Sequence, residues 1–106
     1  MIYEFCIAGV QHHQSKLIAH MLKPGDKLHL EREPENTYDS NAIKINYQNE
    51  EKKYNNICMG YVPSKYSTQI SSEMLTKKCT CVLKDYTPTE KPWKKFLVII
   101  TVEENK

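Results

Sequence analysis

A chain of 106 residues, 40% hydrophobic and 9% aromatic, is long enough for one domain with a modest core and too short for two. Its longest apolar run, residues 96–100, falls far below the roughly 18 residues that a membrane helix needs, and Glu4 interrupts the start of the chain before a signal-like stretch can form. We therefore expect an intracellular protein, one domain over residues 1–106, without membrane association. The net charge is +2, but residues 1–51, 52–95 and 96–106 carry −3, +6 and −1, which fits either a phosphate-facing surface in the second half or lysines that solvate loops.

The first 62 residues predict four short strands and one short helical segment. Apolar residues alternate loosely over residues 1–10, and with a clear period of two over residues 27–32 and 41–47. Those at positions 17, 18, 21 and 22 have helical spacing, which predicts a short helical segment near 15–22 that Pro24 and Gly25 end as a turn. Residues 48–56 are polar and predict a hairpin tip, and residues 57–62 predict the fourth strand.

The second half predicts the main helix and two more strands. Ser64 is expected to cap a helix over about residues 64–77, which Lys77 and Lys78 close favourably against its dipole. One apolar stripe follows the helical period: Tyr66, Ile70, Met74 and Leu75. Residues 79–86 and 96–103 are rich in Val, Ile and Thr and predict strands, joined by an exposed loop at 87–95. Six short strands with one main helix predict an α+β chain that is mainly β, built as a small barrel.

A dense polar turn separates the second and third expected strands. Pro34 cannot donate to a sheet ladder, so the second strand should stop at Glu33. Asn36, Asp39 and Asn41 can each turn a side chain back onto nearby backbone N–H groups. The pattern predicts a rigid loop between residues 33 and 42.

Two motifs give the chain a strong resemblance to the HIRAN family. They are Arg32-Glu33-Pro34-x-Asn36-x-Tyr38-Asp39-x-Asn41-Ala42-Ile43-x-Ile45 and Gly60-Tyr61-Val62-Pro63, and residues 5–10 fit an upstream strand. The resemblance covers residues 5–66 and implies an OB-like β-barrel that binds DNA and performs no chemistry. Family members sit at the N-terminus of Swi/Snf-type fork-remodelling translocases, where they capture free 3′ ends of single-stranded DNA, and they also occur alone in short prokaryotic and viral proteins.

Asp39 is the first candidate site residue. The resemblance implies that its carboxylate accepts a hydrogen bond from the 3′-hydroxyl of a terminal nucleotide, and at such close range a carboxylate repels a terminal phosphate. Capping of its own turn is the alternative, and both roles are compatible. Tyr38 is expected to bury its ring beneath the turn, and Arg32 to brace the loop through Glu33, Glu35 or Asp39.

The remaining candidates would contact bases or phosphates. Tyr61 is a base-stacking platform beside Gly60, which allows close backbone approach, and Lys65 and the N–H groups at the helix start could reach a phosphate. Trp93 with Lys94 mixes an aromatic face with positive charge, a pattern that suits single strands but also a simple lid over the core.

The junction after the first strand departs from the family pattern. DNA-binding relatives present a basic residue and aromatics there, where this chain has Gln11, His12 and His13. Imidazoles can stack on bases and donate to phosphate, or they can simply be solvated surface groups.

No enzyme motif, cofactor site or metal site is expected. The sequence lacks a Gly-rich phosphate loop and a nucleophile motif, and its four cysteines lack zinc-ligand spacing, so they are expected to be free thiols. The leading interpretation is a module that recognises single-stranded DNA ends, preferably with a free 3′-hydroxyl, at repair or replication intermediates. The rival is an adaptor that keeps the barrel without the DNA slot and docks to a replication, repair or nuclease protein. RNA binding is a third alternative.

Overall fold

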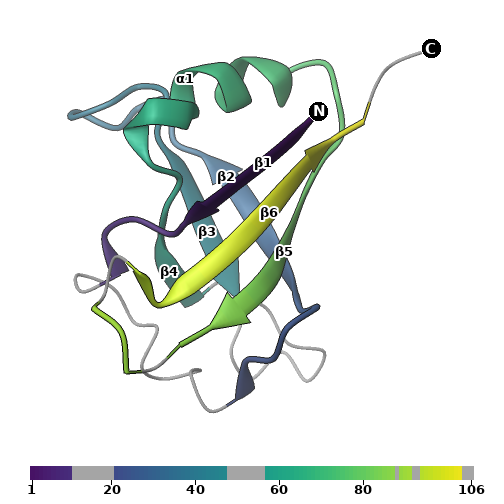
Figure 1. Ribbon diagram of the computed structural model, residues 1–106. Helices are drawn as coiled ribbons and strands as arrows, with labels where there is room; N and C mark the ends of the chain where they lie inside the picture. Colours follow the sequence, from purple (N-terminus) through teal and green to yellow (C-terminus); the bar gives the residue numbers. More distant parts are fainter. Residues whose placement is uncertain (11–20, 48–56, 88, 92–93, 104–106) are drawn as a thin grey trace.

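Six antiparallel strands and one helix make up the computed structural model, which describes residues 1–10, 21–47, 57–87, 89–91 and 94–103. The elements are β1 (Ile2–Cys6), β2 (Lys27–Arg32), β3 (Ile43–Tyr47), β4 (Ile57–Tyr61), α1 (Ser64–Glu73), β5 (Cys79–Tyr86) and β6 (Phe96–Val102). Their order in the sheet is β1-β6-β5-β2-β3-β4 (Figure 1). The mainly β fold with one main helix, predicted from the sequence, is confirmed.

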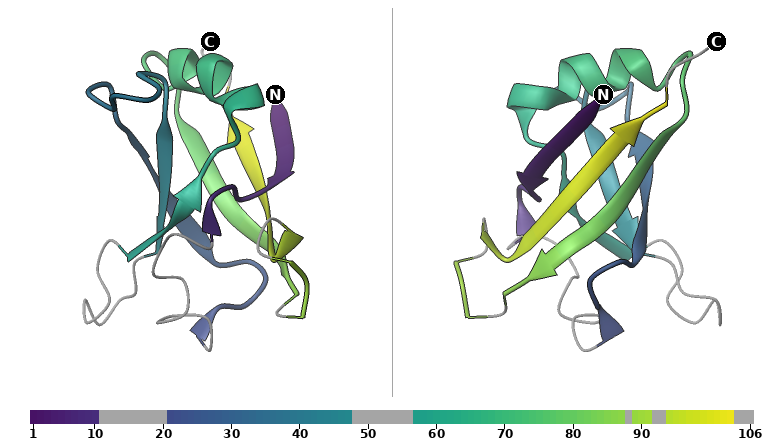
Figure 2. Two further views of the ribbon diagram at one scale, coloured as in Figure 1. Left: turned by 90° about the vertical axis from the view of Figure 1, so that its left-hand side faces the viewer. Right: turned by 45° about the vertical axis from the view of Figure 1, so that its right-hand side comes forward.

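The sheet curls into a half-barrel with β1 and β4 as its outer strands, and the segment that follows β1 reaches β4 at one point (Figures 1 and 2). There Ala8 and Tyr61 form a bridge in which each N–H donates to the other carbonyl, at 2.9 and 2.8 Å. Gly60, next to this bridge, has φ +151°, and a Cβ at this position would lie 2.3 Å from the Ala8 carbonyl oxygen. Only glycine allows the strands to approach this closely.

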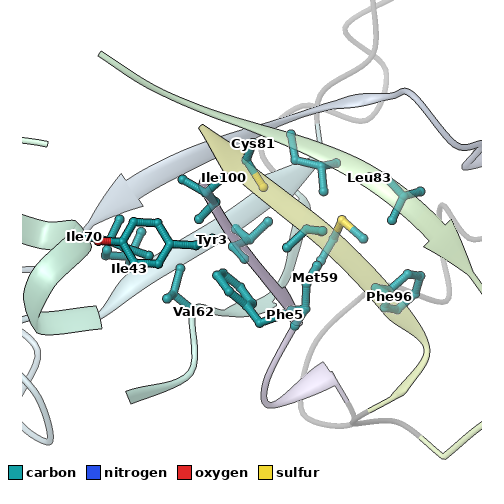
Figure 3. Close-up of a cluster of buried hydrophobic side chains, with 14 of the residues drawn as sticks. Tyr3, Phe5, Ile43, Met59, Val62, Ile70, Cys81, Leu83, Phe96 and Ile100 are labelled. Carbon is teal, nitrogen blue, oxygen red and sulfur yellow. The ribbon is translucent and has the colours of Figure 1, made fainter. Parts of the chain in front are cut away.

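The core lies inside the curl and follows the alternation of the strands (Figure 3). Along β6, every second residue is buried, from Phe96 to Val102. Ile43 and Ile45 of β3 and Ile70 of α1 are fully buried against this row. The period of two in the sequence therefore identified the core face of these strands.

Helix α1 covers one end of the half-barrel (Figures 1 and 2). It differs from the prediction at both ends: Pro63 occupies the N-cap position without a side-chain hydrogen bond, so Ser64 is the first helical residue, and the helix ends at Glu73. Its last turn contains no basic residue, because Lys77 lies beyond it and pairs with Glu73 at 3.4 Å. Leu75, expected in the apolar stripe, is 65% exposed for the same reason.

The other boundaries agree more closely with the sequence. Strands β2 and β5 have the predicted bounds, and β3, β4 and β6 are shorter by one or two residues. The first strand was predicted to reach Val10, but β1 ends at Cys6, because the chain then turns from β6 toward β4. Most of the predicted helical segment near 15–22 and the hairpin tip at 48–56 lie outside the described residues. None of the described helices is long and apolar enough to cross a membrane.

Candidate functional site

The loop of residues 33–42, between β2 and β3, is held by its own side chains. The Asn36 side-chain oxygen accepts the N–H groups of Tyr38 and Asp39 at 2.8 and 3.0 Å. Asp39 Oδ1 accepts the N–H of Asn41 at 2.8 Å. These bonds are the local turns that Asx residues form, so the loop has the internal bracing predicted from the sequence.

The loop lies beside α1 (Figures 1 and 2), and three side-chain hydrogen bonds fasten the loop and the end of β2 to this helix. They are Arg32 Nε to Ser71 Oγ at 3.0 Å, Asn41 Nδ2 to Thr68 Oγ1 at 3.4 Å, and Ser67 Oγ to Asp39 Oδ2 at 3.2 Å. Ser67 and Ser71 are buried, and short hydroxyl side chains leave room for the loop to approach the helix. The expectation that Arg32 braces the loop through a neighbouring acid is wrong, because its guanidinium reaches the helix instead.

A second network joins the loop to β3 and β4. The Tyr61 hydroxyl donates to Glu33 Oε1 at 2.8 Å, and Lys44 Nζ lies 3.1 Å from Glu33 Oε2. Burial acts to raise the pKa of Glu33, but the hydrogen bonds from Tyr61, Lys44 and Asn36 outweigh it and lower that pKa. Burial, together with the hydrogen bond to Glu33, raises the pKa of Tyr61 to about 12. The pair is therefore a neutral phenol donating to an ionised carboxylate.

The loop and β4 enclose a hollow of about 520 Å³, here called the Asp39 pocket. Its lining is Ala8, Gly9, Asn36, Tyr38, Asp39, Ala42, Tyr61, Val62 and Ser64. Asp39 is the only charged residue among them, and the other lining residues are neutral. The barrel bridge supplies Ala8 and Tyr61, so the closure of the barrel also shapes this pocket.

A second hollow of about 570 Å³, here called the acidic pocket, adjoins the first. Its lining is Glu31, Arg32, Glu33, Pro34, Glu35, Asn36, Thr37, Tyr38 and Tyr61. Asn36, Tyr38 and Tyr61 belong to both pockets and form the wall between them. The two pockets are therefore neighbours on the surface of the domain.

The position of Tyr38 contradicts the sequence analysis. Its ring was expected beneath the turn, but the residue is 98% exposed. The hydrogen bonds from Asn36 fix the backbone on either side of it, so an exposed aromatic ring stands at the edge of both pockets. Tyr38 is therefore a candidate contact residue that the sequence analysis missed, because the sequence shows an aromatic residue but not the direction in which its ring points.

Asp39 keeps room for another hydrogen-bond donor. A carboxylate offers about four acceptor positions. Within the described part of the chain, the Asn41 N–H donates to Oδ1 and the Ser67 hydroxyl donates to Oδ2, so two of these acceptor positions are used. The residue is half-buried and lines the pocket, so a hydroxyl group in the pocket can reach it.

The other candidates are dispersed. Lys65 is exposed, and its Nζ lies 5.4 Å from the centre of the Tyr66 ring, on the outer side of α1. Lys94 is exposed near the start of β6, where its charge partly opposes the rise that burial causes in the pKa of Cys6. Gln11, His12, His13 and Trp93 lie outside the described residues.

The cysteines are free thiols, and burial raises the pKa of Cys81 to about 12. Within residues 1–10, 21–47, 57–87, 89–91 and 94–103, no group of three or more His, Cys, Asp or Glu side chains could hold a metal ion.

A family model shows the family, and two solved structures show the same fold. A family model described as the HIRAN domain matches residues 2–103. The HIRAN domain of human HLTF has a similar structure, with a TM-score of 0.65 and 17% identity, covering 95% of this chain and 74% of that one. A protein from Lactobacillus plantarum is also similar, with a TM-score of 0.68 and 17% identity, covering 95% and 92%. No curated protein matches the sequence.

Proposed function

Since the chain belongs to the HIRAN family of DNA-binding domains, we propose that it binds the end of a single DNA strand carrying a free 3′-hydroxyl. It would do so as a binding module, without catalysing a reaction. The observation that carries the proposal is the placement of Asp39, half-buried in a pocket with the aromatic side chains of Tyr38 and Tyr61.

The Asp39 pocket has the properties that a terminal nucleoside needs. Its volume of about 520 Å³ falls in the range of roughly 300–1,000 Å³ typical of ligand pockets. The exposed ring of Tyr38 offers a face on which a base can stack, and stacking contributes ~1–3 kcal/mol per base. The Asp39 carboxylate would accept a hydrogen bond from the 3′-hydroxyl, and it would repel a phosphate in the same place.

Other parts of the chain would contact the rest of the strand. Lys65 and Lys94 are exposed and can approach phosphates. We propose Gln11, His12, His13 and Trp93 as further contacts: the imidazoles can stack on bases or donate to phosphates, and the indole can stack on a base. Such contacts give affinity without sequence preference, and they weaken as salt rises. The surplus of positive charge is small, so the affinity should be modest.

The test is a titration with labelled single strands ending in a 3′-hydroxyl or a 3′-phosphate, and with a strand blocked at its 5′ end, at two salt concentrations. The protein should prefer the 3′-hydroxyl strand and tolerate the 5′ block. In Asp39→Asn, the amide oxygen can still accept the Asn41 N–H, so the loop should persist while the discrimination against 3′-phosphate falls. Equal binding of both 3′ ends by the unaltered protein would refute the proposal.

One observation favours the rival function. Three glutamates line the acidic pocket, and an acidic surface suits a basic segment of a protein partner better than it suits DNA. An adaptor for a replication, repair or nuclease protein would bind none of the oligonucleotides. Competition between matched DNA and RNA strands tests the third alternative, which is RNA binding. The terminal ribose of RNA would bring its 2′-hydroxyl into the same pocket.

A further inference from the structure

We infer that the acidic pocket is an electrostatic stop that prevents a DNA strand from continuing past the Asp39 pocket. The inference rests on the proposed function and deepens it. Asp39 would select the chemical group at the strand end, and the acidic pocket would select strands that end there over strands that pass through. The strand would then leave on the side of Ala8, Gly9 and Ser64.

The arrangement of the two pockets supplies the first argument. They share a wall of Asn36, Tyr38 and Tyr61, so a strand running through the Asp39 pocket in that direction must cross into the acidic pocket. Its next phosphate would lie among Glu31, Glu33 and Glu35. On the opposite side, Ala8, Gly9 and Ser64 carry no charged side chain that would oppose a phosphate.

The charges in the acidic pocket are fixed as well as numerous. Glu33 is held ionised by the Tyr61 hydroxyl at 2.8 Å and by Lys44 at 3.1 Å. Glu31 and Glu35 are exposed, so their charges face solvent and an approaching strand. Among the described residues that line this pocket, Arg32 is the only base, and its Nε is turned toward Ser71 of α1. When Lys44, which pairs with Glu33, is counted with Arg32 against the three glutamates, these described groups keep an excess of one negative charge.

The magnitude is sufficient for discrimination. Near a protein surface, removing one unit charge several ångströms from a phosphate changes an affinity by roughly threefold, and salt screens the effect over about 8–10 Å. Two such charges give about tenfold. A repulsion of this kind weakens as salt rises, whereas a steric barrier in the same place does not.

The experiment compares circular single-stranded DNA, which has no end, with a linear strand that has a 3′-hydroxyl. Circular DNA is used to displace a labelled 3′-hydroxyl oligonucleotide from the protein, so that only binding at the pocket is measured. The variant is Glu31→Gln with Glu35→Gln, which keeps the side-chain shapes and leaves Glu33 with its partners. The control is Glu90→Gln with Glu103→Gln, which also removes two negative charges, at exposed residues that line neither pocket.

In low salt, the double variant should reduce the ratio of the affinity for linear DNA to the affinity for circular DNA by about tenfold. In high salt, this reduction should be smaller. The control should leave the ratio unchanged. An unchanged ratio in the double variant, while the unaltered protein still prefers the 3′-hydroxyl strand, would overturn the stop and leave the proposed function standing. An unaltered protein without any end preference would overturn both.

Discussion

The two walls of the Asp39 pocket are held in different ways. The loop wall, residues 33–42, depends on many side-chain hydrogen bonds, within the loop and to α1. The opposite wall depends on two backbone hydrogen bonds between Ala8 and Tyr61 and on the missing side chain of Gly60. A wall built from many bonds should weaken gradually under substitution, whereas a wall built on one close approach should fail at one residue.

The largest effect is therefore expected for Gly60→Ala. The new Cβ would lie 2.3 Å from the Ala8 carbonyl oxygen and 2.6 Å from Ile7 Cγ2, and φ +151° is strained for any residue with a Cβ. The free energy of unfolding should fall by more than about 3 kcal/mol, measured by urea denaturation. Gly25→Ala is the matched control: its φ is also positive, but nothing lies within 4 Å of its Cβ position, so about 1–2 kcal/mol is expected. Equal losses in both variants would show that the close approach is unimportant.

The loop wall should show smaller and separable losses. Ser71→Ala removes the hydroxyl that accepts from Arg32 and should cost ~1.5–3 kcal/mol, since a charged donor is left without this partner. A double-mutant cycle with Arg32→Met measures the coupling between the two side chains. A coupling energy near zero would mean that this bond does not fasten the loop. Ser72→Ala, at an exposed position next along the helix, serves as the control.

The network between the two walls predicts a dependence on alkaline pH. The pKa of Tyr61 is raised from 10.0 to about 12, so its stabilising contribution is complete below pH 10 and is lost as the pH rises through 12. Absorbance at 295 nm should show Tyr61 ionising near pH 12, and Tyr61→Phe should reduce the absorbance change there by the contribution of one tyrosine. If the titration curves of the two proteins differ only near pH 10, the hydrogen bond to Glu33 does not hold the phenol.

The same network also predicts a loss of stability in acid, through Glu33. The pKa of Glu33 is lowered from its ordinary value of 4.5, so its contribution is present above that pH and is lost as the pH falls through the lowered pKa. Thermal unfolding between pH 5 and pH 2 should show a smaller decrease for Glu33→Gln than for the unaltered protein. Parallel decreases would argue against an ionised Glu33 in the fold.

The smallest change in stability is expected at Tyr38. The residue is 98% exposed, so Tyr38→Ala should alter the free energy of unfolding by less than about 0.5 kcal/mol. Binding of a 3′-hydroxyl strand should nevertheless weaken by about tenfold or more, because a stacking face is lost. A variant that is equally stable and binds equally well would remove Tyr38 from the site.

The sequence predicted local features well and long-range ones poorly. The turns of Asn36 and Asp39 were predictable because each side chain bonds to backbone two or three residues away. The hydrogen bond from Arg32 to Ser71 spans 39 residues. The sequence around Arg32 shows several acids as possible partners, and nothing in it indicates a serine that lies so far along the chain. The exposure of Tyr38 depends on which side of the loop α1 covers, and that is decided by packing of the whole domain.

The hydroxyl of Ser67 connects the pocket to the helix. It carries one hydrogen and has two acceptors, Asp39 Oδ2 at 3.2 Å and the Ser64 carbonyl at 3.3 Å. A guest that donates to Asp39 would compete for the first acceptor and leave the hydrogen to the second, which tightens the opening turn of α1. Occupancy would then be visible at a distance from the guest, as slower deuterium uptake by the amides of that turn.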